Sequence, residues 1–337
     1  MMSSVRYCKL RDAKVIIAPE RLQRPSNFST PKQEDDLSLC PFEPGSENAT
    51  PNAIYTAEDK NGQWTCRVFP NLYKALSIEE PKESKRIGFF TQESGLGAHE
   101  VIVETPHHDL TMNHYTLEQW HNYLKAISSR IKDLSHDSRL AHIQIFKNHG
   151  ASAGATLKHP HSQIIATAFI PPEIESDIER QRAYFKKHHR ALLIDMVQEE
   201  KRESKRVIYE NSAFIAFTPF ASLNAFEVII APKEQKSDIS TFHVETLKEL
   251  SRALQDVYKK LYAILGDFDF NMIIKNPPIK IEHVDPNYFY QMDQFYTFHI
   301  QIIPRLYTLA GYEFATGMRI NPILPEIAAQ RLKEEKN

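Results

Sequence analysis

Two histidines separated by one residue follow a loop of small residues in the stretch 148–166. The residues after them form an apolar run that ends at two prolines, which predicts a strand. Because residues i and i+2 of a strand point to the same face, we expect His159 and His161 to share one site, with Gln163 next along that face. The glycines of the loop allow backbone N–H groups to approach a ligand closely.

This arrangement suits phosphoryl or nucleotidyl transfer with a histidine as covalent carrier. One imidazole can hold a metal or shape the site while the other stays free as nucleophile or base. The small-residue loop would supply donors for phosphate oxygens. The main alternative is a metal-dependent hydrolase, in which His159 and His161 would both be metal ligands.

Composition narrows the class of protein. The chain has 337 residues, 42% hydrophobic and 25% charged, with a formal net charge of -2. These values predict a globular protein of about two domains. There is no basic excess for binding nucleic acid and no apolar run long enough to span a bilayer. Three cysteines do not make a disulfide framework, and the N-terminus lacks the layout of a signal peptide, so we expect a cytoplasmic protein.

Hydrophobic spacing indicates the elements that position the histidines. Apolar runs predict strands near 15–18, 99–105 and 140–146. Apolar residues at helical spacing predict an amphipathic helix over 117–134. The charged segment 173–198 is expected to be one long, largely solvated helix.

The pattern of elements occurs twice. Three segments of the second half echo the first half in the same order: 226–230 echoes 99–103, 274–276 echoes 146–148, and 299–303 echoes 161–165. This predicts a duplicated strand–helix–strand unit with halves 1–172 and 173–337. The expected fold is α+β, with helices packed on a mixed, mainly antiparallel sheet. The second copy has no histidine two positions before His299, so the first half is expected to be catalytic.

The sequence resembles the galactose-1-phosphate uridylyltransferase family, a branch of the histidine-triad superfamily. The resemblance is carried by the segment 148–163, with its core His159-Pro160-His161-Ser162-Gln163, and by further motifs in the family's order at residues 21–25, 40–45, 68–71, 99–106 and 310–313. It covers most of the chain. It implies a duplicated histidine-triad-like domain whose second half completes the sugar-phosphate site.

The resemblance implies a double displacement. His161 would attack the α-phosphorus of a nucleotide sugar, and the nucleotidyl group would then pass to an acceptor phosphate. Gln163 and backbone N–H groups of the loop would stabilise the phosphoryl oxygens. Positions matched to substrate-binding residues of the family are Arg21, Arg24, Asn71, Asn148, Ser152, Gly154, Ser162, His299, Gln301, Tyr312 and Arg319.

The resemblance also implies one structural zinc site, formed by Cys40, Glu43, His108 and His159. Relatives have a second cysteine where this chain has Glu43. A carboxylate can bind zinc, so we expect the metal to be retained; loss of zinc, with Glu43 as a polar remnant, is the alternative. Some relatives have a second metal site that uses an acidic residue near Asp177. The other histidines of that site are mostly missing here, so we do not expect it.

The resemblance implies a UDP-glucose:hexose-1-phosphate uridylyltransferase acting on a nucleotide sugar and a sugar 1-phosphate. Ser162 stands where uridylyltransferases usually have glycine, and the loop 150–155 is also similar to the branch that phosphorolyses ADP-glucose. An ADP-glucose phosphorylase is therefore the alternative. A metal-dependent hydrolase and a non-catalytic nucleotide-binding paralogue are lesser alternatives. The resemblance also implies a homodimer, and neither a nucleic acid nor a membrane is an expected partner.

Overall fold

The computed structural model describes residues 3–23, 40–279, 283 and 285–334. Arg24, expected to contribute to the phosphate site, lies outside the described residues. None of the helices in the described part of the chain has the length and apolar character of a membrane span.

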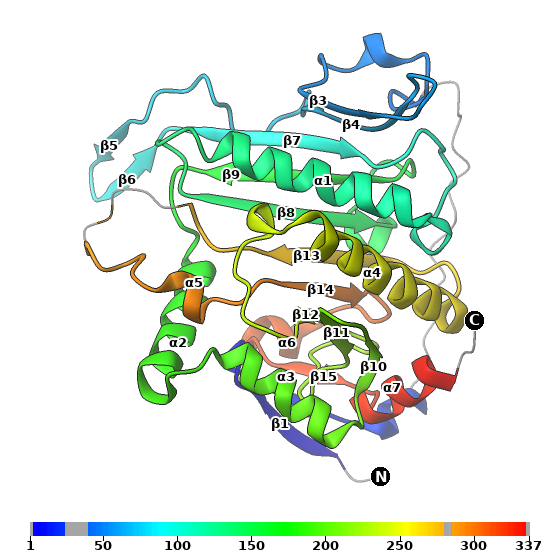
Figure 1. The fold of residues 1–337 in the computed structure, drawn as a ribbon. Coiled ribbons are helices and arrows are strands. Elements are labelled where there is room, and N and C mark those ends of the chain that lie inside the picture. The colour runs from blue at the N-terminus through cyan, green and yellow to red at the C-terminus, as the bar shows by residue number, and fades with distance from the viewer. Residues whose placement is uncertain (1–2, 24–39, 280–282, 284, 335–337) are drawn as a thin grey trace.

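A sheet of ten strands forms the centre of the molecule, in the order β10-β11-β12-β14-β13-β8-β9-β7-β4-β3 (Figure 1). Every pairing within it is antiparallel. The strands are β3 (Tyr55–Glu58), β4 (Trp64–Pro70), β7 (Gly97–Val103), β8 (His142–His149), β9 (His161–Thr167), β10 (Val207–Glu210), β11 (Phe214–Phe217), β12 (Val228–Pro232), β13 (Phe270–Lys275) and β14 (His299–Pro304). The two halves meet where β8 pairs with β13.

Two long helices, α1 (Leu117–Leu134) and α4 (Val244–Leu265), lie side by side over one face of this sheet (Figure 1). A capping box at Thr116 and Gln119 begins α1. The buried rings of Trp120 and Tyr258 stack between the two helices, with their centroids 5.4 Å apart. The apolar faces of both helices join the main hydrophobic core. This face is therefore closed, and chemistry is left to the opposite face.

The opposite face is covered differently in the two halves. In the second half, α3 (Leu192–Glu203) packs with β2 against β11 and β12. In the first half, Cys40 and Phe42 pack on β4 and β7. The remaining elements are β1 (Ser4–Cys8), β2 (Ala13–Ile17), β5 (Ser84–Ile87), β6 (Phe90–Glu93), β15 (Arg319–Asn321), α2 (Pro172–His188), α5 (Met292–Phe295), α6 (Gly311–Thr316), α7 (Pro325–Glu334) and short 3-10 turns. Strands β1, β2 and β15 form a small sheet in which β15 runs parallel to β2.

The predicted α+β class with a mainly antiparallel sheet is confirmed, and so is the helix over 117–134. The prediction of one helix over 173–198 is wrong. The chain leaves α2 at His189, which adopts a left-handed conformation with φ 54°, and α3 begins at Leu192. The break lets the two helices pack on each other, and the Tyr184 hydroxyl donates to Asp195 at 2.6 Å.

The strand pairings show which residues of the two halves are structurally equivalent. For two of the three repeated segments, the equivalent residues differ by one position from those that the sequence repeat had matched. Gln163 lies opposite Val101, and Gln301 lies opposite Ile229, so Val101 corresponds to Ile229. The echo would have matched Val101 with Val228, which faces α4 in the core. Continuous apolar runs carry no signal that could fix this register from sequence.

Candidate active site

His161 lies at the start of β9, and its ring is held in one orientation. Its Nδ1 lies 2.8 Å from the backbone oxygen of His159 and donates to it. In the neutral ring, this contact places the lone pair on Nε2. Burial, together with the ammonium group of Lys147, lowers the pKa of His161 and favours the neutral ring. The rings of Phe42 and His161 pack edge to face, with their centroids 5.5 Å apart.

Gln163 lies two residues along β9, on the same face as His161. Its Oε1 is 2.8 Å from Nε2 of His99 on β7. Asn71, at the end of β4, is placed beside them, because its backbone N–H donates to the His99 carbonyl at 2.8 Å. The structure thus brings Asn71 and Gln163 together through a histidine that the sequence analysis did not single out.

Two glycines shape the small-residue loop after β8. The backbone N–H groups of residues 152–155 in this loop already have acceptors within the protein. Gly150 and Gly154 have φ of 82° and 88°, in the left-handed region. The N–H groups of residues 153–155 donate to backbone oxygens within the loop. The N–H and hydroxyl of Ser152 both donate to the Asp269 carboxylate, at 2.7 and 2.5 Å. The expectation that these N–H groups are free for phosphate is therefore wrong in this arrangement of the loop.

The second half contributes directly to this loop. The Asn271 side chain donates to Oδ1 of Asn148 and to the oxygen of Ala153, both at 2.9 Å. Asn271 lies opposite Asn148 in the pairing of β13 with β8. Sequence analysis did not identify Asp269 and Asn271. The repeat could have indicated them, because the two halves of a duplicated sheet must join through one strand from each half, and residues on those two strands then lie opposite each other.

Ser162 points away from the site. Strand alternation turns it to the face covered by α1, where its side chain is fully buried. Its hydroxyl donates to Glu104 and lies 2.9 Å from the Tyr123 hydroxyl. The expectation that Ser162 binds substrate is therefore wrong for its side chain.

A buried ion pair lies against the start of β9. The Lys147 ammonium donates to both Glu104 oxygens, at 3.0 and 2.9 Å, and to the His161 carbonyl at 3.1 Å. The Tyr115 hydroxyl adds a bond to Glu104 at 2.8 Å. Both charged side chains are almost completely excluded from solvent. This network holds the backbone on which His161 stands, and nothing in the local sequence pattern had indicated it.

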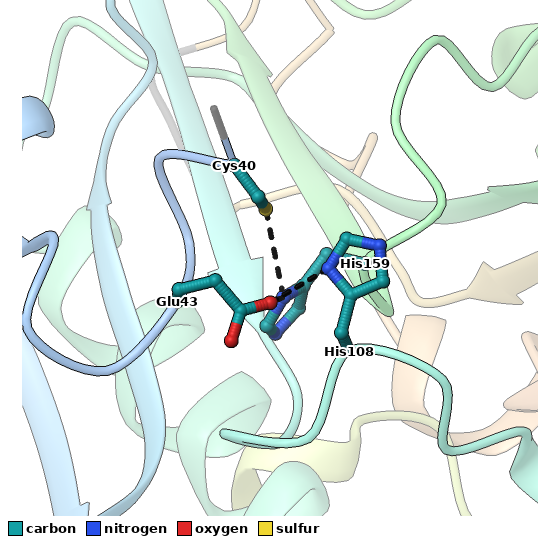
Figure 2. A group of neighbouring side chains, drawn as sticks. All are labelled: Cys40, Glu43, His108 and His159. Atoms are coloured by element: carbon teal, nitrogen blue, oxygen red, sulfur yellow. Dashed lines mark hydrogen bonds and ion pairs between the residues drawn. The ribbon is translucent and has the colours of Figure 1, made fainter. Parts of the chain in front are cut away.

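The four residues expected to bind zinc gather in one group (Figure 2). One side-chain ligand atom from each of Cys40, Glu43, His108 and His159 lies within 4.8 Å of all the others. Nδ1 of His108 and Nδ1 of His159 lie 2.7 and 3.2 Å from Oε1 of Glu43. Nε2 of His159 donates to the Thr105 carbonyl at 2.8 Å, so its Nδ1 lone pair faces the cluster. This donor set fits tetrahedral zinc.

Other predicted residues lie elsewhere in the chain. His299 and Gln301 are on β14, which β13 and β8 separate from β9. At a strand spacing of about 4.8 Å, this places them roughly 14 Å from the His161 strand. Arg319 is in β15, within the small sheet. The Tyr312 hydroxyl, on α6, contacts the sulfur of Met318 at 3.4 Å, and Arg21 is exposed in the turn Pro19–Gln23.

The fold and the site define an α+β protein whose two halves share one antiparallel sheet. In its first half, His161 lies two residues beyond His159, a member of a group that could hold a metal ion. The chain belongs to the galactose-1-phosphate uridyl transferase family of transferases: the N-terminal domain of that family matches residues 1–171 and its C-terminal domain matches residues 177–337.

Relatives from two branches of the family are similar to this chain. ADP-glucose phosphorylase from Arabidopsis thaliana is 31% identical over 95% of this chain and 89% of that protein. Galactose-1-phosphate uridylyltransferase from Thermotoga maritima is 31% identical over 79% of this chain and 83% of that protein. A crystal structure of the Arabidopsis phosphorylase with bound ADP-glucose matches with a TM-score of 0.84 at 28% identity and covers all of both chains.

Proposed function

We propose that this protein transfers a nucleotidyl group from a nucleotide sugar to an acceptor phosphate through His161. The first candidate is UDP-glucose:hexose-1-phosphate uridylyltransferase activity, on galactose 1-phosphate as acceptor. The observation that carries the proposal is the bond from Nδ1 of His161 to the His159 carbonyl. It orients the ring so that the unprotonated Nε2 is the reactive atom.

The proposed reaction has two displacements. The Nε2 lone pair of His161 forms a bond to the α-phosphorus, and the bond from that phosphorus to the bridging oxygen of the sugar phosphate breaks. The leaving sugar 1-phosphate takes the electron pair, while the His159 carbonyl stabilises the Nδ1–H of the modified ring. A phosphate oxygen of the acceptor then attacks the same phosphorus and releases neutral His161. Gln163 would donate to the nonbridging oxygens throughout.

A zinc ion is part of the proposal as a structural group. Cys40, Glu43, His108 and His159 would hold it, and when bound it would cross-link the segment that begins at Cys40 to the His159 backbone. His159 then has two roles in this chain. Its ring binds at the metal site, and its carbonyl orients the nucleophile.

A second candidate is the phosphorolysis of ADP-glucose, with an adenylyl-histidine and inorganic phosphate as acceptor. It is favoured by the similarity to the Arabidopsis phosphorylase over the whole chain. A metal-dependent hydrolase is less well supported, because the Nδ1 of His161 is engaged by a backbone carbonyl while that of His159 faces the other cluster residues. A non-catalytic paralogue is less well supported because the reactive nitrogen keeps its orientation.

The test is an intact-mass measurement after incubation with UDP-glucose or ADP-glucose in the absence of acceptor, with His161→Asn as the control. We expect a UMP-sized increment on the unmutated protein and none on the variant. An AMP-sized increment would assign the phosphorylase activity instead. Binding of both nucleotide sugars with no increment from either would contradict the covalent mechanism.

The remaining features of the proposal concern assembly and location. We propose a homodimer, since by resemblance the halves of two subunits supply the substrate pockets. The positions His299 and Gln301 on β14, which two strands separate from β9 within one chain, support this. We also propose a reducing, cytoplasmic location, supported by the cysteine content of the chain, because three cysteines do not make a disulfide framework.

A further inference from the structure

His99 connects the loop after β4 to the amide of Gln163. Nδ1 of His99 accepts the backbone N–H of Ala75 at 3.1 Å. A ring nitrogen that accepts carries no proton, so the proton of the neutral ring is on Nε2. Nε2 lies 2.8 Å from Oε1 of Gln163 and therefore donates to it.

This bond determines which end of the Gln163 amide is left for a ligand. With Oε1 bound by His99, the NH2 group is the end that can donate to a phosphoryl oxygen. A rotated amide would turn its carbonyl oxygen towards phosphoryl oxygens, which is repulsive, and would place its NH2 group against the Nε2–H of His99. The ring thus makes one amide orientation favourable and the other unfavourable.

Asn71 is oriented by the same ring. Its Oδ1 accepts the backbone N–H of Tyr73 at 2.9 Å, so its NH2 group is the end 3.1 Å from Nε2 of His99. Because that nitrogen carries a proton, the amide does not donate to it. The NH2 groups of Asn71 and Gln163 therefore flank one imidazole, and each keeps N–H donors for a ligand.

We propose that His99 is a positioning residue for the transfer reaction. It holds Gln163 so that its NH2 group faces the transferring phosphoryl group, and the Ala75 N–H fixes the ring tautomer that makes this possible. The inference deepens the proposed function and rests on it, because the role of Gln163 is part of that function. It adds a link from the loop after β4 to the catalytic amide.

Three substitutions separate the two contacts of the ring. His99→Asn places an oxygen near the Nδ1 position, so it keeps an acceptor for Ala75 but does not reach Gln163. His99→Gln extends an NH2 group towards Gln163. His99→Phe keeps a ring of similar volume and loses both contacts. In single-turnover formation of nucleotidyl-His161, we expect His99→Asn and His99→Phe to be slower by about 10²-fold, since misplaced catalytic groups cost rates of this order.

The pattern across the variants distinguishes positioning from a general structural role. For His99→Asn we expect the loss in kcat, with KM for the nucleotide sugar changed by less than about threefold, because the affected interaction strengthens in the transition state. We expect His99→Gln to recover part of the rate. Nucleotidylation of His99→Asn at the unmutated rate would overturn the proposal.

A spectroscopic measurement tests the contact without any turnover. In a long-range 1H–15N spectrum of protein with 15N-labelled histidine, the His99 signals are those lost in His99→Gln. We expect the Nε2-protonated tautomer; a proton on Nδ1 would overturn the inference. If the unmutated protein forms no adduct with any nucleotide sugar, the proposed function fails, and the tautomer still decides whether His99 orients Gln163.

Discussion

At the scale of single residues, neighbours in sequence serve opposite faces of the sheet. His161 and Gln163 face the site, while Ser162 between them faces α1 and bonds to Glu104. We expect Ser162→Ala to lower the free energy of unfolding by about 1–3 kcal/mol, the value of a lost hydrogen bond to a buried charge. Urea unfolding measures this. A changed ratio of kcat/KM for UDP-glucose and ADP-glucose, without loss of stability, would contradict the buried placement.

The ion pair between Lys147 and Glu104 gives a second prediction for single residues. Lys147→Met would leave the Glu104 carboxylate buried without its counter-charge. We therefore expect this substitution to lower the free energy of unfolding by about 3–5 kcal/mol. Glu104→Gln combined with Lys147→Met removes both charges and should recover much of that loss. A double-mutant cycle in urea measures the coupling. Additive effects of the two substitutions would show that the pair does not act as a unit.

Sequence alone could predict part of the site. The i, i+2 rule placed His161 and Gln163 on one face, and the family motifs indicated the four residues of the metal cluster. The contacts of the Ser152 side chain could not be predicted in the same way. Its carboxylate partner, Asp269, is 117 residues away, and only the pairing of the halves brings it close.

At the scale of elements, the loop after β8 depends on Gly150. A Cβ atom there would lie 1.8 Å from Oδ1 of Asp269, and the residue has φ of 82°. We expect Gly150→Ala to displace the carboxylate from Ser152 and to slow nucleotidyl transfer. Gly62→Ala is the matched control, because Gly62 also has a positive φ, 77°, but has no atom within 4 Å of its Cβ position.

Because of backbone strain, both substitutions should lower the free energy of unfolding by about 1–2 kcal/mol. Urea unfolding measures this change. The additional loss in Gly150→Ala, and its lower rate of adduct formation, would come from the clash with Asp269. Equal stability and equal activity of the two variants would contradict a role for the Asp269 contact.

The group of Cys40, Glu43, His108 and His159 joins segments that are far apart in sequence. We expect the purified protein to contain zinc, and a strong chelator to lower its Tm, because bound metal stabilises the folded state. Glu43→Ala should reduce the zinc content, and Glu43→Cys, which restores a preferred zinc ligand, should retain it. Metal analysis and thermal unfolding measure both effects. Protein that contains no zinc, with a Tm that added zinc does not raise, would contradict the site.

Sequence patterns predicted an element most reliably where its hydrophobic residues repeat with one clear period. The bounds of α1 matched the predicted 117–134, because a capping box and a continuous apolar stripe define it. The break between α2 and α3 was missed, since the charged residues on both sides are all compatible with helix. The register between the halves was also missed, since adjacent apolar residues in β12 allow either face inward.

At the scale of the whole molecule, one sheet runs through both halves. β8 and β13 pair across the boundary, and the helices α1 and α4 pack on each other over them. The second half thereby contributes the side chains of Asp269 and Asn271 to contacts with the loop after β8. The geometry of this loop in the first half therefore depends on the second half, although the proposed nucleophile and the proposed metal ligands lie entirely in the first. The division at residue 172 stays a prediction about sequence units.

Histidines buried in both halves of this sheet make global stability depend on pH. Burial lowers the pKa of His142 on β8, and likewise of His299 on β14, to about 4. Among the described residues, neither ring nitrogen of His142 has a hydrogen-bond partner. Between pH 6.5 and 4 the unfolded chain binds a proton at each of these positions and the folded chain does not, so the free energy of unfolding falls as pH decreases.

His142→Leu removes one of these two groups. A pKa lowered from 6.5 to about 4 corresponds to about 3 kcal/mol, so we expect the stability of His142→Leu relative to the unmutated protein to rise by about that amount between pH 7 and pH 4. Urea unfolding across this range measures the difference. Parallel stability curves for the two proteins would mean that His142 takes up its proton equally in the folded and unfolded states.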